Sequence, residues 1–278
     1  MRKYLVIGNP IAHSLSPLIH NHWMKKYHFS DSVYEKRKIE EKDLKNIIEE
    51  IRKDEVVGVN VTVPFKKLII PFLDQLDFSA EETQSVNTLF KVNNKIVGYN
   101  TDRAGFGDTI REVYPRSNDP IMRQPLEGIR IFILGAGGVT SSIISALKSE
   151  GADNIILSNR TKEKANELKK QFPELEVIDW GKKPPNSNIV INTTSVGLAK
   201  NEELKIDFSD YGKNSHKNFL FYDLIYNPKE TVFLKQARLR GNKTMNGKMM
   251  FLNQAKYAFN IWTNIMPEID NDVIKLLD

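Results

Sequence analysis

The sequence predicts an α/β fold of two domains built on parallel sheets. Short apolar runs typical of strands alternate with helical patterns along nearly the whole chain, and this alternation is typical of sheets covered by helices. A glycine-rich segment, Gly135–Gly138, lies between one such run and the next helical pattern. A turn-rich break, Tyr114–Pro120, divides the chain ahead of it. The length of 278 residues suits two modest domains or one large one.

The individual elements follow from the spacing of apolar residues. Strands are expected at Tyr4–Gly8, Val56–Val63, Arg130–Leu134, Asn154–Ser158, Asn188–Asn192 and Leu220–Asp223. Helices are expected at Pro17–Tyr27 and Glu41–Arg52, near 138–149, 161–171 and 230–240, and over Met249–Ile265. The last helix has an apolar face made of Phe251, Ala255, Ala258, Phe259 and Trp262.

The expected strand Val56–Val63 alternates valine with other residues. Because successive side chains of a strand point to opposite faces, the valines share one face while Asn60 and Thr62 share the other. A proline ends the strand, and Lys66 follows at its carboxyl end, where open α/β sheets bind ligands. Lys66 is therefore a candidate acid–base group, although the same spacing also fits a surface pair with Lys67.

A hairpin is expected over Val86–Thr101, with Asn93-Asn94 as its two-residue turn. In the register set by that turn, Asn87 lies opposite Asn100, and Asp102 projects from the same face. The three polar side chains then face either water or a polar cleft. If they line a cleft, Asp102 is a candidate partner for a catalytic cation.

A polar segment joins the first strand to the first helix, with the sequence Gly8-Asn9-Pro10-Ile11-Ala12-His13-Ser14-Leu15-Ser16-Pro17. Pro17 suits the first position of a helix, which makes Ser16 a natural N-cap. Ser14 has no such structural role. Hydroxyl groups beside the free N–H groups of a helix N-terminus suit a bound carboxylate, so Ser14 and Ser16 are candidate ligand contacts.

The strand Arg130–Leu134 leads into a glycine loop that precedes an expected helix. This G-x-G-x-x-small pattern between a strand and a helix is typical of a Rossmann-like dinucleotide site. Gly135 allows the tight turn, and Gly137 lets the backbone approach a pyrophosphate at the helix N-terminus. The residues expected to bind the cofactor here are Gly135, Ala136, Gly137, Gly138 and Val139.

The residues after the second strand of this unit indicate which dinucleotide binds. An NAD site places an acidic residue about 20 positions beyond the first glycine. This chain has Asn159, Arg160 and Thr161 in that region, with Lys164 one turn further on. Two cations and an amide suit a 2′-phosphate, so NADP is expected rather than NAD. The alternative is that Arg160 and Lys164 are ordinary surface charges.

Charge and composition argue against several other classes of function. The 40 Lys and Arg residues exceed the 35 Asp and Glu residues by a formal charge of +5, which is spread along the chain. A nucleic-acid binder would show a clustered basic stripe with aromatic residues, and only Lys36-Arg37-Lys38 resembles one. The mild excess instead suits an anionic substrate or a phosphate-bearing cofactor.

Metal, disulfide and membrane functions are not expected either. The chain has no cysteine, and His13, His20 and His22 have no carboxylate that would complete a metal site. No apolar run approaches the roughly 20 residues of a membrane span, and the apolar start is too short for a signal peptide. We therefore expect a cytoplasmic protein, as a monomer or a homodimer.

Taken together, these motifs resemble the shikimate dehydrogenase family over nearly the whole chain. The family's patterns are met at Gly8–Pro17, Asn60–Lys66, Val86–Leu89, Asn100–Gly105, Gly135–Gly138, Asn159–Thr161, Asn192–Gly197, Tyr222–Pro228 and Gly247–Gln254. The resemblance implies reversible, NADPH-dependent reduction of 3-dehydroshikimate to shikimate, a step toward the aromatic amino acids. It also implies a substrate domain over 1–103 plus the C-terminal helix at 247–278, and a Rossmann-like NADP-binding domain over 104–246.

The resemblance also implies a role for each site residue. Lys66 would be the acid–base group, with Asp102 as its partner. Ser14 and Ser16 would hold the substrate carboxylate. The other substrate contacts would be Asn60, Thr62, Asn87, Tyr226 and Gln254. Leu224 and Gly247 would lie beside the nicotinamide.

Two alternatives stay open. One is a quinate/shikimate dehydrogenase that uses NAD, against which Asn159 and Arg160 argue. The other is a shikimate-binding regulator that kept the fold and lost catalysis, against which the presence of both Lys66 and Asp102 argues. Methylene-folate dehydrogenases share the general architecture, but the motifs that carry Ser14, Ser16 and Asp102 do not suggest them.

Overall fold

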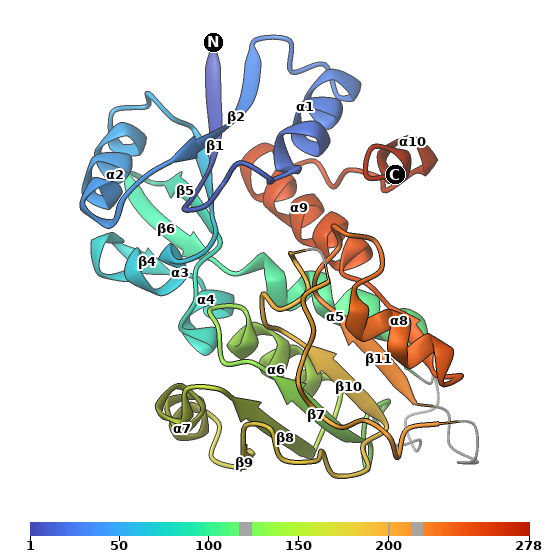
Figure 1. The fold of residues 1–278 in the computed structure, drawn as a ribbon. Coiled ribbons are helices and arrows are strands. Elements are labelled where there is room, and N and C mark those ends of the chain that lie inside the picture. The colour runs from blue at the N-terminus through green and yellow to red at the C-terminus, as the bar shows by residue number, and fades with distance from the viewer. Residues whose placement is uncertain (117–123, 200, 213–218) are drawn as a thin grey trace. The chain divides into compact units, whose positions relative to one another are not determined.

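The computed structural model describes residues 1–116, 124–199, 201–212 and 219–278 (Figure 1). It divides into two compact units, one made of Met1–Phe106 with Leu252–Asp278 and the other of Gly107–Phe251. The expected boundaries, 1–103 plus 247–278 and 104–246, stay a prediction about which residues serve the substrate and which the cofactor. The predicted break at Tyr114–Pro120 lies partly outside the described residues.

The first unit is built on a six-stranded sheet with the order β2-β1-β3-β5-β6-β4 in the described part of the chain (Figure 1). Its strands are β1 (Arg2–Gly8), β2 (Ser32–Lys38), β3 (Gly58–Val61), β4 (Gln75–Leu76), β5 (Thr88–Val92) and β6 (Lys95–Tyr99). β1 pairs in parallel with β2 and β3, whereas β5 pairs antiparallel with β3 and β6. The sheet is thus mixed rather than purely parallel, because the β5–β6 hairpin joins it.

Helices cover both faces of this sheet. They are α1 (Ser16–Lys26), α2 (Leu44–Arg52), α3 (Phe65–Leu68), α4 (Phe78–Thr83), α10 (Asn271–Lys275) and the part of α9 (Lys248–Thr263) that starts at Leu252, with 3₁₀ turns at Glu41–Asp43 and Ile70–Phe72. On one face, Ile47 and Ile48 of α2 share an apolar core with Leu5 and Val59 of the sheet. On the other, Tyr4 packs on Trp262 of α9. The predicted apolar face of α9 is confirmed for Ala255, Ala258, Phe259 and Trp262, which are buried.

Two details of the expected strand Val56–Val63 are wrong. The observed β3 covers only Gly58–Val61, and Val63 is exposed rather than on the core face with the other valines. The strand pairing stops before Val63 because Thr62 and Phe65 close a turn, in which the Phe65 N–H donates to the Thr62 carbonyl at 2.9 Å. That turn leads directly into α3.

The second unit is built on a parallel sheet with the order β12-β11-β10-β7-β8-β9 (Figure 1). Its strands are β7 (Arg130–Leu134), β8 (Asn154–Asn159), β9 (Glu176–Asp179), β10 (Ile189–Asn192), β11 (Leu220–Asp223) and β12 (Lys243–Met245). Its helices are the later part of α5 (Thr101–Val113), α6 (Thr140–Ser149), α7 (Lys162–Gln171) and α8 (Val232–Leu239). The four strands expected here are confirmed, whereas the short edge strands β9 and β12 were not predicted. No helix in the described part of the chain is long and apolar enough to cross a bilayer.

An aromatic cluster in the first unit encloses His20 completely. Its ring stacks on Tyr34 at 4.3 Å between centroids and lies edge-on to Trp23 at 5.8 Å. Trp262 and Phe259 of α9 complete the surroundings. Neither ring nitrogen of His20 has a hydrogen-bond partner, and burial lowers its pKa to about 3. His20 therefore serves the core as a neutral aromatic ring.

The burial of His20 predicts a pH dependence of folding. Its pKa lies below the ordinary value of 6.5 in the folded state, so the unfolded chain binds the extra proton first. Its contribution to stability is complete above pH 6.5 and is lost as the pH falls toward 3, with a slope approaching about 1.4 kcal/mol per pH unit. The His20→Phe variant should lose less stability over this range when urea unfolding is measured at several pH values. Equal slopes for the two proteins would contradict this assignment.

Candidate active site

A buried ion pair lies at the carboxyl end of β3. The Lys66 Nζ lies 2.5 Å from the Asp102 Oδ2, and only 13% and 7% of the two side chains are exposed. Charges shielded from water in this way interact far more strongly than an exposed ion pair, which contributes about 0–1 kcal/mol. Because little of the Lys66 side chain is exposed, the alternative that Lys66 and Lys67 are both surface lysines is wrong for Lys66, although Lys67 is exposed.

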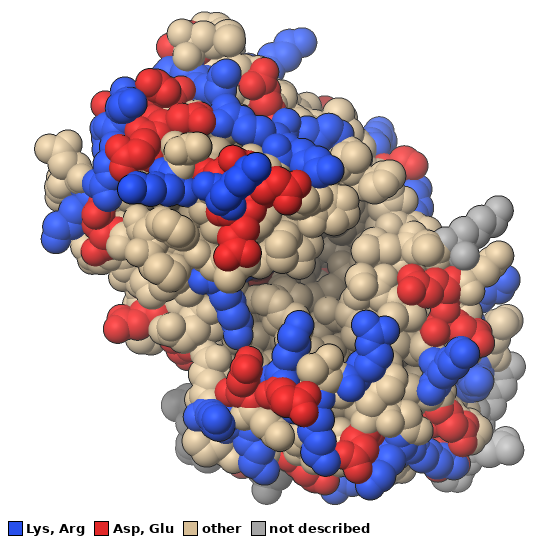
Figure 2. All heavy atoms as spheres, turned by 60° about the vertical axis from the view of Figure 1, so that its left-hand side comes forward, with Lys and Arg blue, Asp and Glu red and all other residues tan. Residues whose placement is uncertain are grey.

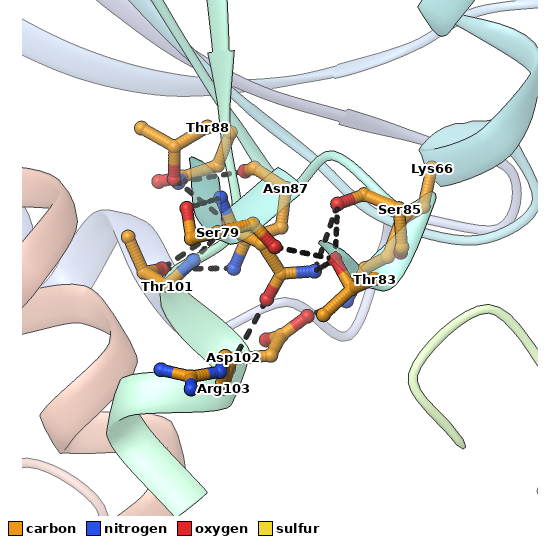
Figure 3. Close-up of polar contacts among 11 residues, drawn as sticks. Lys66, Ser79, Thr83, Ser85, Asn87, Thr88, Thr101, Asp102 and Arg103 are labelled. Carbon is orange, nitrogen blue, oxygen red and sulfur yellow. Dashed lines mark hydrogen bonds and ion pairs between the residues drawn. The ribbon is translucent and has the colours of Figure 1, made fainter. Parts of the chain in front are cut away.

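Two asparagines hold the helix that carries Asp102. The Asn87 Oδ1 accepts a hydrogen bond from the Thr101 N–H at 2.8 Å, and the Asn100 Oδ1 accepts one from the Arg103 N–H at 3.1 Å (Figure 3). These are first-turn N–H groups that have no partner inside a helix. Asp102 therefore lies in a capped first turn of α5, where the helix dipole favours a negative charge.

The predicted placement of Asn87, Asn100 and Asp102 on one face of the hairpin is wrong. The predicted register is confirmed, since Val92 pairs with Lys95, but β6 ends at Tyr99 and a helix begins at Thr101. The chain turns here because the two asparagines accept helix N–H groups. The three side chains still lie close together, but they reach Thr101, Ser85 and Lys66 respectively.

Asn60 and Thr62 differ in their hydrogen bonding. The Asn60 Nδ2 donates both its hydrogens, to the Asn87 carbonyl at 3.1 Å and the Thr88 Oγ1 at 3.0 Å, and its Oδ1 accepts from the Tyr34 hydroxyl at 2.7 Å. Asn60 therefore keeps only an oxygen lone pair for a ligand. The Thr62 hydroxyl has no hydrogen-bond partner among the described residues, so both its donor and acceptor functions are available.

The serine segment before α1 differs from its prediction. Ser16 is the first residue of α1 rather than its N-cap, and no side chain caps this helix by a hydrogen bond of the usual kind. Instead, the Ser14 Oγ accepts a hydrogen bond from the Ser16 N–H at 3.4 Å and lies 3.3 Å from the Ser16 Oγ. The two hydroxyls thus lie together at a helix N-terminus, as a carboxylate site requires.

The glycine loop of the second unit has the geometry of an anion site. Gly135 has φ +106°, and an added Cβ would lie 2.6 Å from the Thr193 Oγ1, so only glycine fits. At Gly137, an added Cβ would meet no atom within 4 Å, which leaves the space beside the loop open. α6 begins at Thr140, so Gly138 and Val139 complete the approach to a helix N-terminus.

Asn159 has a structural role that the sequence did not indicate. Its Oδ1 accepts a hydrogen bond from the Ala136 N–H at 3.0 Å, and its Nδ2 donates to the Thr161 carbonyl at 2.7 Å. Asn159 thus links the glycine loop to the end of β8. Arg160 and Lys164 are exposed, and neither forms an ion pair with a carboxylate in the parts of the chain that the structure describes.

A buried carboxylate holds the segment after β11. The Asp223 Oδ2 accepts a hydrogen bond from the Thr231 hydroxyl at 2.6 Å, and its Oδ1 accepts from the Asn192 Nδ2 at 3.1 Å and the Ile225 N–H at 3.0 Å. Burial raises the pKa of the Asp223 carboxyl to about 6. Asn192, Asp223 and Thr231 were not predicted as site residues, although the first two lie in motifs that resemble the family's.

The segment fixed by Asp223 carries two predicted site residues, Leu224 and Tyr226. An added Cβ at Gly247 would lie 1.9 Å from the Leu224 carbonyl oxygen, so this close approach requires glycine. The Tyr226 ring stacks on Phe251 at 4.4 Å. In the first unit, an added Cβ at Gly105 would lie 2.7 Å from the backbone nitrogen of Gln254, so glycine also lets α9 approach α5 there.

In the described ranges, the charged side chains and the potential metal ligands do not point to a second site. Acidic and basic side chains lie side by side over the face drawn in Figure 2. Within the cluster Lys36-Arg37-Lys38, Arg37 forms an ion pair with Glu50 at 2.8 Å, and Lys36 donates to the Ala12 carbonyl. Among the described residues, no three His, Cys, Asp or Glu side chains gather as metal ligands would.

Sequence comparison then identifies the family. The model of the shikimate dehydrogenase substrate binding domain matches residues 6–89, and that of shikimate / quinate 5-dehydrogenase matches residues 121–229. The shikimate dehydrogenase (NADP(+)) of Pelagibacter ubique is 49% identical over 277 residues, which cover 100% of this chain and 99% of that protein. The chain belongs to the shikimate dehydrogenase family. The predicted resemblance is confirmed.

Solved structures of shikimate dehydrogenases agree with this assignment. That from Aquifex aeolicus has a TM-score of 0.86 and 36% identity, with 100% of this chain and 97% of that chain covered. That from Thermus thermophilus, in complex with NADP(H) and shikimate, has a TM-score of 0.81 and 28% identity, with 100% and 98% covered. The two-domain α/β fold predicted from the sequence is confirmed.

The matched ranges of the shikimate dehydrogenase family divide the candidate site. The substrate-domain match contains Ser14, Thr62 and Lys66, and the second match contains the glycine loop and Arg160. Asp102 lies between the two ranges. Neither matched range includes Asp102, so its contact with Lys66 is observed in the three-dimensional structure and not in the family matches.

Proposed function

We propose that this protein catalyses the reversible, NADPH-dependent reduction of 3-dehydroshikimate to shikimate, a step toward the aromatic amino acids. The observation that carries the proposal is the Lys66–Asp102 ion pair, whose two side chains are largely shielded from water. The names of its relatives and the shikimate bound in the Thermus thermophilus structure support the choice of substrate. Formation of NADPH from shikimate and NADP, followed by absorbance, tests it directly. A protein that binds shikimate without reducing NADP would instead be a regulator.

The residues of the second unit fit NADP. The open space at Gly137 and the N-terminus of α6 suit the pyrophosphate, so Gly135, Ala136, Gly137, Gly138 and Val139 would hold it. Arg160 and Lys164 are exposed and have no carboxylate partner in the described part of the chain, which leaves them for a 2′-phosphate. Asn159 and Thr161 would support them. Leu224 and Gly247 would lie beside the nicotinamide. When bound, NADPH supplies the hydride that adds to the carbonyl carbon.

Lys66 would act on the reacting oxygen of the substrate. Negative charge grows on this oxygen as the carbonyl is reduced, and the Lys66 ammonium can stabilise the charge and donate a proton to it. In the reverse direction, Lys66 would accept the proton of the shikimate hydroxyl. Asp102 accepts a hydrogen bond from Lys66, so it fixes the direction of the ammonium and keeps its charge compensated when the substrate excludes water.

The remaining polar groups would orient the ring. The Ser14 and Ser16 hydroxyls lie together at the N-terminus of α1, where a carboxylate is favoured. The Thr62 hydroxyl, the second Asn87 N–H and the Asn60 oxygen would contact ring hydroxyls, together with Tyr226 and Gln254. Most of these groups already have protein partners that fix their positions, so binding would cost little side-chain entropy.

The Lys66 assignment predicts a selective loss of turnover. Lys66→Ala should lower kcat for shikimate oxidation by about 100-fold or more, because it removes the acid–base group, with a smaller change in KM. Lys67→Ala is the matched control, since the neighbouring lysine is exposed, and it should retain normal rates. Near-normal turnover of Lys66→Ala would refute the role.

The cofactor assignment predicts a selective loss of NADP binding. Arg160→Ala should raise KM for NADP far more than KM for NAD, because only NADP carries the 2′-phosphate that the guanidinium binds. Initial rates with both cofactors, and with shikimate and quinate, give the measurement. Equal effects on NADP and NAD would remove the 2′-phosphate argument and favour the NAD-dependent quinate/shikimate alternative.

A further inference from the structure

We propose that Asn100 is a positioning residue that sets the contact between Lys66 and Asp102. This inference rests on the proposed function of that pair. Asn100 is 2% exposed, so it acts from within the protein. Its side chain accepts a hydrogen bond from the helix that carries Asp102 and donates to Thr83 and Ser85 (Figure 3). The residue after Ser85 bonds in turn to the backbone of Lys66.

The oxygen of the Asn100 amide fixes Asp102. The Asn100 Oδ1 accepts a hydrogen bond from the Arg103 N–H at 3.1 Å, which caps the first turn of α5. Asp102 lies between these two residues in the chain, so its backbone is held from both sides. An N-cap of this kind stabilises the start of a helix, and here it fixes the backbone position from which the Asp102 side chain extends.

The nitrogen of the same amide fixes the Lys66 side of the pair. The Asn100 Nδ2 donates to the Ser85 carbonyl at 2.8 Å and to the Thr83 Oγ1 at 3.0 Å (Figure 3). The next residue after Ser85, Val86, donates its N–H to the Lys66 carbonyl at 2.9 Å. Two hydrogen bonds thus connect the Asn100 amide, through one peptide unit, to the backbone of Lys66.

The backbone of Asn100 is fixed as well. Its N–H donates to the Ser79 Oγ at 3.0 Å, and the Ser79 hydroxyl in turn donates to the Asp77 Oδ1 at 2.6 Å. The amide plane therefore cannot shift to follow only one of its partners. An amide offers an acceptor and two donors on one rigid plane. Neither serine nor aspartate at this position can cap α5 and donate two hydrogen bonds to Thr83 and Ser85.

Accurate placement of the pair matters because catalysis depends on geometry. A displacement of about 1 Å in a reacting group can cost as much as 100-fold in rate. Lys66 and Asp102 come from different helices, and their contact of 2.5 Å fixes their ends only if both backbones are fixed. The Asn100 side chain bonds directly to the helix that carries Asp102 and, through the Ser85–Val86 peptide unit, to the backbone of Lys66.

The test compares variants that keep the cap and remove the amide donors. Asn100→Ser retains an acceptor suited to an N-cap but cannot reach Ser85. Asn100→Asp retains the shape but places an oxygen where the donor was. We expect either variant to lower kcat about 10- to 100-fold with little change in KM for shikimate. Asp270→Ala is the control, because it removes the N-cap of α10 in the same unit. It should lower thermal stability and leave kcat unchanged.

A second readout does not depend on activity. The rate at which an amine-reactive anhydride acylates Lys66, followed by peptide mass spectrometry, should rise in Asn100→Ser and Asn100→Asp because the ammonium is less protected by Asp102. Lys67, which is exposed, is the internal standard and should not change. If the wild-type protein has no dehydrogenase activity, the proposed function fails while the acylation rates still test the positioning role. The proposal is overturned if a folded Asn100→Ser or Asn100→Asp variant has the same kcat as the wild-type protein and its Lys66 is acylated at the wild-type rate.

Discussion

The buried ion pair between Lys66 and Asp102 is the interaction on which the rest of the site depends. Removing two charges from water is costly, and the cost is offset only when geometry is good and other hydrogen bonds complete the site. Asn87 and Asn100 contribute to this geometry by capping the helix that carries Asp102, where they accept hydrogen bonds from the Thr101 and Arg103 N–H groups. The same asparagines in the first unit therefore serve two purposes. They satisfy N–H groups at a helix N-terminus, and they help to fix the geometry that a proton donor needs.

The second unit depends on close approaches of the backbone rather than on charge. Gly135 and Gly247 lie where any side chain would strike a neighbouring group. Asp223 holds the end of β11 through three hydrogen bonds, from Thr231, Asn192 and the Ile225 N–H. The N-terminus of α6 and the exposed Arg160 are not used by these constraints and are accessible to phosphate groups. In each unit, several positions accept only one type of residue, either a particular polar side chain or glycine. This explains why short motifs identified the family.

The sequence predicted most elements, because apolar periodicity reports burial directly. It missed the edge strands β2, β4, β9 and β12, in which few residues are buried, and it missed the helices α3, α4, α5 and α10. It placed Val63 on one face with the other valines and Asp102 on the face of a strand, since neither the turn at Thr62 nor the capping role of Asn87 can be read from period two. Lys66 and Asp102 were proposed correctly as neighbours. The structural roles of Asn100 and Asn159 were not predicted, because an asparagine in a motif does not reveal which partners its amide oxygen and nitrogen will bind.

The most direct test of the central claim is a double-mutant cycle on the ion pair. Lys66→Met and Asp102→Asn would be made singly and together, and kcat for shikimate oxidation measured for all four proteins. If the two residues act as one unit, the effects are far from additive, and the double variant is about as slow as the slower single variant. Independent effects, in which the two losses of kcat multiply in the double variant, would contradict the account.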